Sequence, residues 1–366
     1  MSLDERLDLF AIKGQFERFS ELLDLGGVVT DVEFLRRARR ALLPLPLIDR
    51  REEEIDASQV FPALAERPAT ELQGKRIAVV ASGGGGAAVA LVGVRRAFEE
   101  AGVEPAEIVS CSGGAIWGSM WAAGMSAEEM AEFSLSWSPR DYIDVNWLGL
   151  PRYALSALRG FTGIAKGEAI EGLFDRRLVG MRCGDTPIPI TTIVYNMDLG
   201  TVEYFGSERT PDVPVGHLVR VAIALPLFIE SVPVHGHLYV DGGIIEVWPA
   251  QPVIEEGGFD RVLGVNFMLP REFRPRDITG WPDRPGGLLE ASRQLQQGYH
   301  LELARRAQQQ LGDRLTLIDP VEASELRGTS FYDLFLDRSH WPRLMRQGYD
   351  AASAALDAFR PAAERV

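Results

Sequence analysis

Four consecutive glycines, Gly83–Gly86, separate a short apolar segment from one with helical character. Residues 77–81 read IAVVA, which is typical of a strand buried on both faces of a sheet. Residues 87–102 read AAVALVGVRRAFEEAG, which predicts a helix that ends at Gly102. Four glycines in a row destabilise a chain unless the backbone itself is used. The pattern therefore indicates a buried strand, a loop whose N–H groups serve a purpose, and a helix.

The alternation of strand and helix continues along the chain. A second short strand is predicted at 107–111, and it turns at Ser112-Gly113-Gly114 into a helix over 115–124. Further strands are predicted at 189–196, 201–205, 237–240, 261–267 and 314–318, and further helices at 168–178, 215–225, 287–311 and 340–359. We therefore expect an α/β fold: a three-layer α/β/α sandwich with a mainly parallel central sheet.

The first part of the chain has a different pattern. Apolar residues recur at helical spacing between residues 4 and 44, and a mixed segment with prolines and charges follows them. A boundary is expected near residues 68–75, before the first strong strand. We predict a helical N-terminal extension or cap over residues 1–72, an α/β domain over residues 73–366, its core at 76–270 and a helical C-terminal part at 271–366.

Composition excludes several classes of protein. The 366 residues carry 38 Lys+Arg and 52 Asp+Glu, a net charge of −14, which argues against a nucleic-acid partner. Cys111 and Cys183 are too few for a disulfide scaffold or a zinc finger, so a reduced, cytoplasmic location is expected.

Contact with a membrane is expected to be peripheral at most. The sequence contains no apolar run of ~18 residues and no signal-peptide pattern at its start. The basic cluster Arg36, Arg37, Arg39 and Arg40 fits the solvated side of a helix better than a lipid contact. Aromatic residues gather at 115–153, where we expect core together with a lid or acyl-pocket wall. A second aromatic group, at 328–344, fits either docking on a bilayer or core packing against the N-terminal helices.

The turn Ser110-Cys111-Ser112-Gly113-Gly114 places a serine between a strand and a helix. Its form is close to G-x-S-x-G, in which a sharp turn exposes a serine hydroxyl at a helix N-terminus. Ser110 takes the place of the first glycine and is small enough to serve. The alternative is that Ser112 only caps the helix.

The glycine loop at 83–86 can bind an anion, either a phosphate or a developing oxyanion. A P-loop would continue with Gly-Lys-Ser/Thr, but Ala87 and Ala88 follow here. A dinucleotide loop needs an acidic residue at the end of the next strand, and Glu104 and Glu107 lie before that strand or at its start. An oxyanion loop is the better interpretation.

Asp241-Gly242-Gly243 follows the predicted strand at 237–240 and puts a carboxylate at the end of that strand. Alone, it is a turn signal. Sheets of this class place their sites at the carboxyl ends of strands, where Ser112 and the glycine loop are also expected. Together, the three elements predict a serine hydrolase with a Ser112–Asp241 dyad.

The chain resembles the patatin-like phospholipase family. The resemblance is carried by SGGGGAAVALVGVRRAFEEAG (82–102), SCSGGAIWGS (110–119), AIALPLFIESVPVHGHLYVDGG (222–243) and, in the tail, QGYDAASAALDAF (347–359). It covers residues 76–270 well and 271–360 loosely.

The resemblance implies a role for each matching residue. Ser112 would be the nucleophile, and Asp241 would take its proton directly, without a histidine. The oxyanion and substrate would be bound by backbone groups of the glycines Gly83, Gly84, Gly85, Gly86 and Gly113. The implied activity is cleavage of lipid or other acyl esters through an acyl-serine intermediate, with no cofactor.

Two adjacent positions depart from the family. Its loop usually carries Arg or Lys where this chain has Ala87, and glycine where it has Ala88. A phosphate head group would lose a charged partner here, which favours a neutral acyl ester or a thioester as substrate. The same dyad would also serve an acyltransferase, and a catalytically silent lipid-binding or regulatory protein is a further alternative. The sequence leaves the oligomeric state open.

Histidines are the remaining candidates for a Ser–acid–His triad or a metal site. His300 and His340 follow Asp241, but both lie in helical surroundings and are expected to be structural. His235 and His237 flank a hairpin glycine without an accompanying carboxylate or cysteine cluster, so no metal site is predicted.

Overall fold

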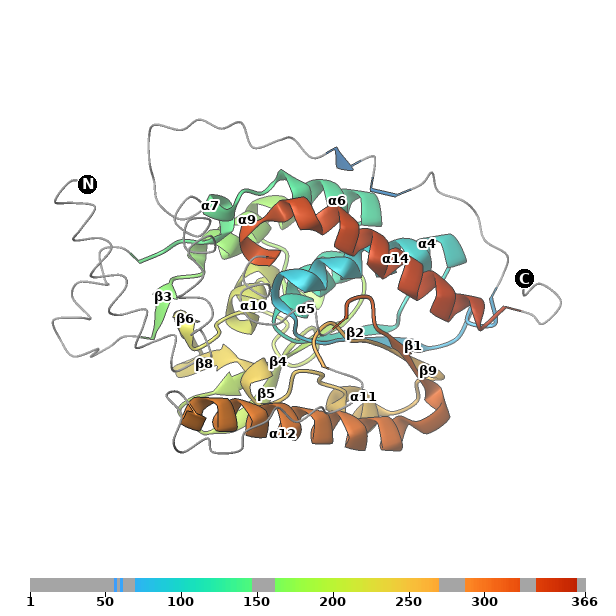
Figure 1. The fold of residues 1–366 in the computed structure, drawn as a ribbon. Coiled ribbons are helices and arrows are strands. Elements are labelled where there is room, and N and C mark those ends of the chain that lie inside the picture. Colours follow the sequence, from blue (N-terminus) through green and yellow to red (C-terminus); the bar gives the residue numbers. More distant parts are fainter. Residues whose placement is uncertain are drawn as a thin grey trace, which may run out of the picture.

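The computed structural model describes residues 56–57, 60–61, 70–146, 162–269, 287–322 and 334–360 (Figure 1). The helices predicted between residues 4 and 44 lie outside these residues, as do the basic cluster at 36–40 and parts of both aromatic segments.

An eight-stranded sheet forms the centre of the molecule, with the strand order β10-β9-β1-β2-β4-β8-β7 and with β5 paired to β4. The parallel strands are β1 (Ile77–Ala81), β2 (Glu107–Ser110), β4 (Ile190–Asn196), β9 (Arg261–Val265) and β10 (Leu315–Ile318). The antiparallel strands are β5 (Thr201–Gly206), β7 (Val232–Val234) and β8 (His237–Asp241). The predicted α/β fold with a mainly parallel sheet is thus confirmed.

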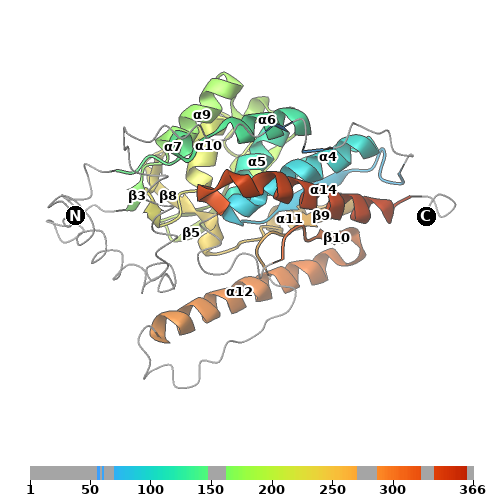
Figure 2. The same cartoon turned by 45° about the horizontal axis from the view of Figure 1, so that its top comes forward.

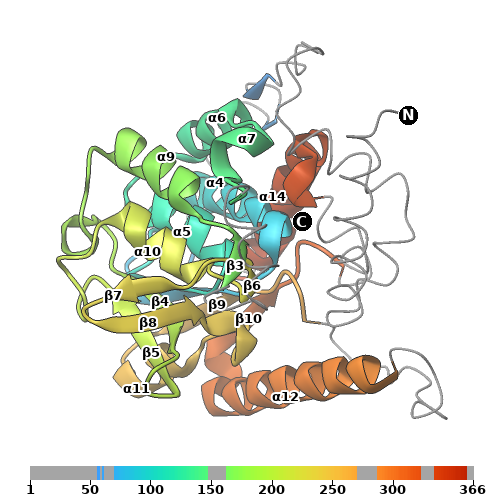
Figure 3. The same cartoon turned by 90° about the vertical axis from the view of Figure 1, so that its left-hand side faces the viewer.

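Helices cover both faces of this sheet, which gives the three layers (Figures 1 and 3). One face carries α4 (Leu91–Ala101), α5 (Gly113–Ala122), α6 (Ala127–Ser136), α7 (Pro139–Tyr142), α9 (Glu168–Leu178), α10 (Val215–Ala222) and α14 (Trp341–Asp357). The other carries α11 (Gln251–Glu256) and α12 (Gly287–Leu311). A small parallel sheet joins β3 (Gly163–Ala165) to β6 (Leu227–Ile229).

The side chains of β1 alternate between two hydrophobic cores. Ile77, Val79 and Ala81 belong to the larger core, under α4, α5 and α14. Ala78 and Val80 belong to the smaller core, with residues of α11 and α12. A strand that faces apolar layers on both sides needs an unbroken apolar run. This explains why the strand could be predicted from the sequence IAVVA.

Most predicted elements are present with small shifts at their ends, but the start of one helix differs and several short elements were not predicted, among them α7, α11, β3, β6 and β7. The helix predicted over 87–102 begins as a 3-10 helix, η2 (Gly85–Ala90), and becomes α-helical only at Leu91; it ends as predicted at Gly102, whose φ is 61°. Helix α6 was not predicted, although Ser126 and Glu129 form a capping box at its start.

Helix α14 lies along α4 and η2 (Figure 2). Two glycines permit this contact: a Cβ at Gly93 would lie 1.8 Å from the carbonyl oxygen of Met345, and one at Gly348 would lie 1.9 Å from that of Ala90. The described aromatic residues at the start of α14 are core. Trp341 is buried, with its ring 5.7 Å from that of Trp117 in an edge-to-face contact.

Trp341 is therefore part of the core, where it packs on Trp117 of α5. No helix in the described part of the chain combines the length and apolar character needed to span a membrane.

Candidate active site

Ser112 lies at the sharp turn between β2 and α5. Its φ is 49° and its ψ is −126°, a conformation that costs a non-glycine residue about 1–3 kcal/mol. Ser112 holds the N-cap position of α5, yet its side chain makes no capping hydrogen bond. The structure therefore gives no support to the alternative that Ser112 only caps the helix.

Small residues around Ser112 let two backbone segments meet. A Cβ at Gly113 would lie 2.3 Å from the carbonyl oxygen of Gly85, and one at Gly114 would lie 2.5 Å from that of Ser82. The turn and the glycine loop are thus in direct contact, and larger side chains at these two glycines would force them apart.

Strand β4 brings Asp241 to the turn. Strand β5 occupies one edge of β4 along residues 191–196. The other edge is shared: β2 pairs with residues 190–192, and β8 pairs in the opposite direction with residues 194–196. The ends of β2 and β8 therefore approach each other head-on, with Ser110 opposite Thr192 and Asp241 opposite Val194.

The Asp241 carboxylate is 1% exposed and has partners on both sides. It accepts a hydrogen bond from the Gly243 N–H at 2.8 Å, and the Ser112 hydroxyl interacts with it closely enough to lower its pKa. The Cys111 thiol lies 4.0 Å from its Oδ1. Burial raises the pKa of Asp241 to about 6, against the opposing effects of Ser112 and of the Gly243 N–H. The carboxylate is ionised at neutral pH but more basic than an exposed aspartate.

Ser82 fixes the start of the glycine loop. Its hydroxyl donates to the Gly83 carbonyl at 2.8 Å and accepts from the Phe267 N–H at 2.9 Å. The loop then enters η2, whose first internal bond runs from the Ala87 N–H to the Gly84 carbonyl. The N–H groups of Gly85 and Gly86 precede that bond, as the first donors of a helix do, so η2 does not consume them.

The loop glycines differ in what they touch. A Cβ at Gly83 would lie 3.3 Å from the Ser112 Cβ, so Gly83 and Gly85 are the loop residues that contact the serine turn. Gly84 packs on the side chain of Phe267, and Gly86 packs on the backbone of Leu334. Close packing therefore restricts the side chain at Gly83, Gly84 and Gly86, and the φ of 55° favours glycine at Gly85.

Ala87 and Ala88 have no exposed surface. Both lie in η2, against α14, within the larger hydrophobic core. The position that is basic in related loops is here part of the core, so a cation at this point would have to be buried.

Further titratable groups surround the site. Burial raises the pKa of Glu246, five residues after Asp241, to about 7. Burial and the charge of Asp241 raise the pKa of the Cys111 thiol, which argues against a reactive thiolate. The sequence did not identify Glu246 because a lone glutamate among apolar residues carries no motif.

The histidines contribute neither a triad nor a metal site in the described part of the chain. His300 is buried on α12 and contacts the Ile244 carbonyl, whereas His340 lies beside Asp337. His235 lies 3.7 Å from Asp212, and the residues described contain no cluster of three potential metal ligands.

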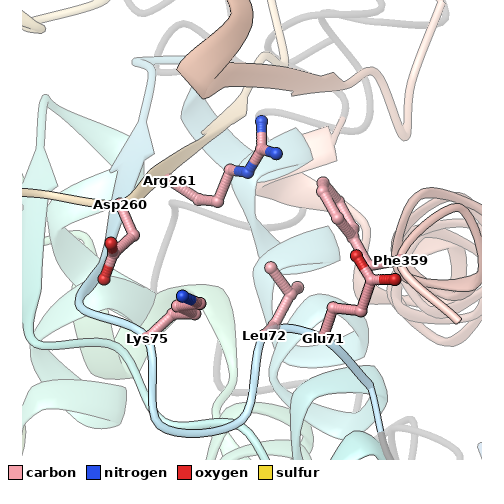
Figure 4. A pocket seen from close by; sticks show the side chains of 6 residues that line it. All are labelled: Glu71, Leu72, Lys75, Asp260, Arg261 and Phe359. Carbon is pink, nitrogen blue, oxygen red and sulfur yellow. The ribbon is translucent and has the colours of Figure 1, made fainter. Parts of the chain in front are cut away.

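A separate pocket of about 310 Å³ lies at the opposite end of the sheet, where β1 and β9 begin (Figure 4). It is lined by Glu71, Leu72, Lys75, Asp260, Arg261 and Phe359. Its position at the amino ends of the strands separates it from Ser112 and Asp241.

This chain is similar to several known proteins. An uncharacterized NTE family protein of Mycobacterium tuberculosis is 31% identical over 179 residues, which are 49% of this chain and 45% of that protein. Lysophospholipase NTE1 of Cryptococcus neoformans is 25% identical over 219 residues, 59% of this chain and 13% of that protein. The matched region is thus less than half of either relative.

The crystal structure of VipD from Legionella pneumophila superposes with a TM-score of 0.46 at 17% identity, over 81% of this chain and 70% of VipD. Residues 79–254 match the model of the family described as patatin-like phospholipase. This range includes the glycine loop, Ser112 and Asp241. Residues 79–254, just under half of the chain, therefore match a patatin-like phospholipase domain.

Proposed function

We propose that this protein is a serine acyl hydrolase that cleaves lipid or other acyl esters, with Ser112 as nucleophile and Asp241 as general base. The observation that carries the proposal is the meeting of β2 and β8 along β4, which brings the Ser112 hydroxyl to the buried Asp241 carboxylate, whose pKa is raised to about 6. A serine hydroxyl becomes a useful nucleophile when such a base lies within hydrogen-bond reach.

In the first half of the reaction, Ser112 Oγ attacks the ester carbonyl carbon while Asp241 takes the hydroxyl proton. The carbonyl oxygen becomes an oxyanion, for which the N–H groups of Gly85 and Gly86, which η2 itself does not bind, are candidate donors. When the tetrahedral intermediate collapses, the ester C–O bond breaks, and the leaving alcohol takes the proton from Asp241. Ser112 is left acylated.

The second half repeats these steps with water. Asp241 takes a proton from a water molecule as its oxygen attacks the acyl carbon. Collapse breaks the bond to Ser112 Oγ, which recovers the proton from Asp241, and the fatty acid leaves. An alcohol in place of water would make the same site an acyltransferase, so products formed with and without added alcohol distinguish the two activities.

The substrate is proposed to be an acyl ester or thioester that needs no cation at the glycine loop. Ala87 is buried in the core and offers a head-group phosphate no charged partner. A relative named lysophospholipase supports a lipid as the source of the acyl group.

Labelling with a fluorescent fluorophosphonate tests the proposal directly, because the probe reports an activated serine whatever the natural substrate is. We expect the wild type to be labelled, Ser112→Ala to lose labelling, and Asp241→Asn to be labelled at least about 100-fold more slowly. Ser136→Ala and Asp313→Asn, which change exposed residues, are the matched controls. Full labelling of Ser112→Ala would refute the assignment.

A further inference from the structure

Helix α12 contacts the turn that follows Asp241. Gln296 Nε2 donates a hydrogen bond to the Ile244 carbonyl at 3.2 Å, and His300 Nε2 lies 3.4 Å from the same oxygen. The two side chains are four residues apart, so they project from the same face of the helix onto one acceptor. This carbonyl belongs to η4 (Gly242–Ile244), which begins directly after the proposed base.

The burial pattern of α12 fixes how these two residues approach. Leu295 is 76% exposed and Tyr299 is also exposed, whereas His300 is 8% exposed. His300 is the first buried residue among those of α12 whose side chains are described, and Ala304, Ala307 and Leu311 continue the buried row into the smaller core. Among the residues of α12 whose side chains are described, the buried row therefore begins at the contact with the turn after Asp241.

The contact with the Ile244 carbonyl determines which nitrogen of His300 carries the proton. A carbonyl oxygen only accepts, so the His300 nitrogen that faces it carries the proton. Burial lowers the pKa of His300, which keeps its ring neutral at neutral pH. A neutral ring with one N–H directed at Ile244 has its other nitrogen unprotonated, and neither nitrogen contacts Ser112 or Asp241 in the described structure.

A short path leads from Ile244 to the carboxylate. The Gly243 N–H donates to Asp241 Oδ1 at 2.8 Å, and the Ile245 N–H closes the turn on the Gly242 carbonyl at 2.9 Å. Gly243 has no room for a side chain, since a Cβ would lie 2.9 Å from Cys111 Sγ and 3.0 Å from Asp241 Oδ1. A three-residue 3-10 turn is weak on its own, so its orientation depends on what holds it from outside.

We propose that Gln296 and His300 are positioning residues for Asp241: by holding the Ile244 carbonyl, they keep the Gly243 N–H directed at the carboxylate that activates Ser112. This inference rests on the proposed role of Asp241 as base. It gives α12, which lies outside the matched family region, a part in the reaction.

The test uses the full chain with Gln296→Met, which keeps the side-chain length without a donor, His300→Leu, and the double variant. We expect the double variant to lose about 5–10-fold in kcat with little change in KM, as removal of one supporting hydrogen bond implies. His300→Gln, which retains an N–H donor, should recover part of this loss. Glu302→Gln, an exposed change on the same helix, is the matched control and should behave as wild type.

The pH profile separates positioning from a general loss of structure. A carboxylate that loses the Gly243 N–H becomes easier to protonate, so the acid limb of kcat/KM should move upward by about half a pH unit or more. Ser112 and Cys111 face Asp241 from the turn after β2, and Glu246 lies on its own segment. The comparison is therefore repeated in a Glu246→Gln background.

Hydrogen exchange at the Gly243 amide gives a readout that does not depend on activity, with faster exchange expected in the double variant. Unchanged exchange, or an unchanged acid limb in a variant with reduced kcat, would overturn the positioning role. If the double variant does not fold, the same measurements on Gln296→Met alone decide between the two outcomes. Gln296 is exposed, so its replacement should not unfold the protein. Gly243 exchange could be faster in the double variant although fluorophosphonate does not label the wild type. That result would support the contact between α12 and the turn but contradict the proposed function.

Discussion

Asp241 is placed where a carboxylate is costly to keep. It is almost fully buried, and its pKa is about 6 in the folded chain, above the ordinary value of 3.8. Such a group destabilises the fold once both states are ionised, which is the usual price of a reactive site. Asp241 was predictable as a candidate from Asp-Gly-Gly after a strand, but its burial was not, because that depends on β2 and β8 meeting along β4.

Replacing this charge should stabilise the protein in a pH-dependent way. Below pH 3.8 Asp241 is protonated in both states and contributes nothing; above pH 6 it is ionised in both, and the folded state is disfavoured. A difference of about two pKa units corresponds to about 3 kcal/mol. We therefore expect Asp241→Asn to raise the free energy of unfolding by up to about 3 kcal/mol at pH 8 and by little at pH 4.

Denaturant unfolding of Asp241→Asn and wild type at the two pH values measures this difference. Asp313→Asn, on the surface, should show no such dependence. Equal stability of Asp241→Asn and wild type at pH 8 would mean that burial does not raise the pKa of Asp241 in the folded protein.

At the scale of elements, the sequence predicted most strands and helices because two apolar layers give β1 a continuous run and surface helices a periodic one. The start of the helix after the glycine loop was placed incorrectly. Residues 85–90 form a 3-10 helix pressed between the serine turn and α14, and these partners lie far away in the sequence. Local periodicity carries no information about such contacts.

The contact between α14 and η2 should support the glycine loop. Gly348→Ala places a Cβ 1.9 Å from the Ala90 carbonyl, so the two helices must separate. We expect a loss of stability of about 1–3 kcal/mol together with slower fluorophosphonate labelling, because η2 begins with the loop glycines. Thermal unfolding and labelling rate measure the two effects.

Gly298→Ala is the control for this change, because a Cβ there meets no atom within 4 Å. In the middle of α12 it should stabilise the protein by up to about 1 kcal/mol. A Gly348→Ala protein as stable and as reactive as wild type would show that α14 can shift without disturbing the loop.

At the scale of the whole molecule, the site belongs to the carboxyl edge of the sheet, while residues before β1 complete the core on another side. Val60 and Leu72 are buried in the larger core, and the Val60 carbonyl accepts a hydrogen bond from Arg346 of α14. The proposed boundary after residue 72 therefore follows residues that pack on the α/β domain.

Truncation tests whether Val60 and Leu72 stabilise the α/β domain. A chain that begins at residue 56 keeps Val60 and Leu72, whereas one that begins at residue 73 loses both buried side chains. Each contributes about 1.5–3 kcal/mol when fully buried, so the shorter chain should be less stable by about 3 kcal/mol or more. Thermal unfolding of the two truncated proteins compares them, and equal midpoints would contradict the packing of Val60 and Leu72.

Strand β4 is the template on which two parts of the proposed site, distant in sequence, are aligned. The pairing registers of β2 and β8 on β4 set the distance between the ends of these two strands. A slip of β8 by two residues would leave every side chain on its own face of the sheet, yet move Asp241 by about 7 Å. Such a protein would be folded and well packed but inactive. Spectroscopic evidence of folding therefore does not show whether β8 pairs with β4 in the register that brings Asp241 to Ser112.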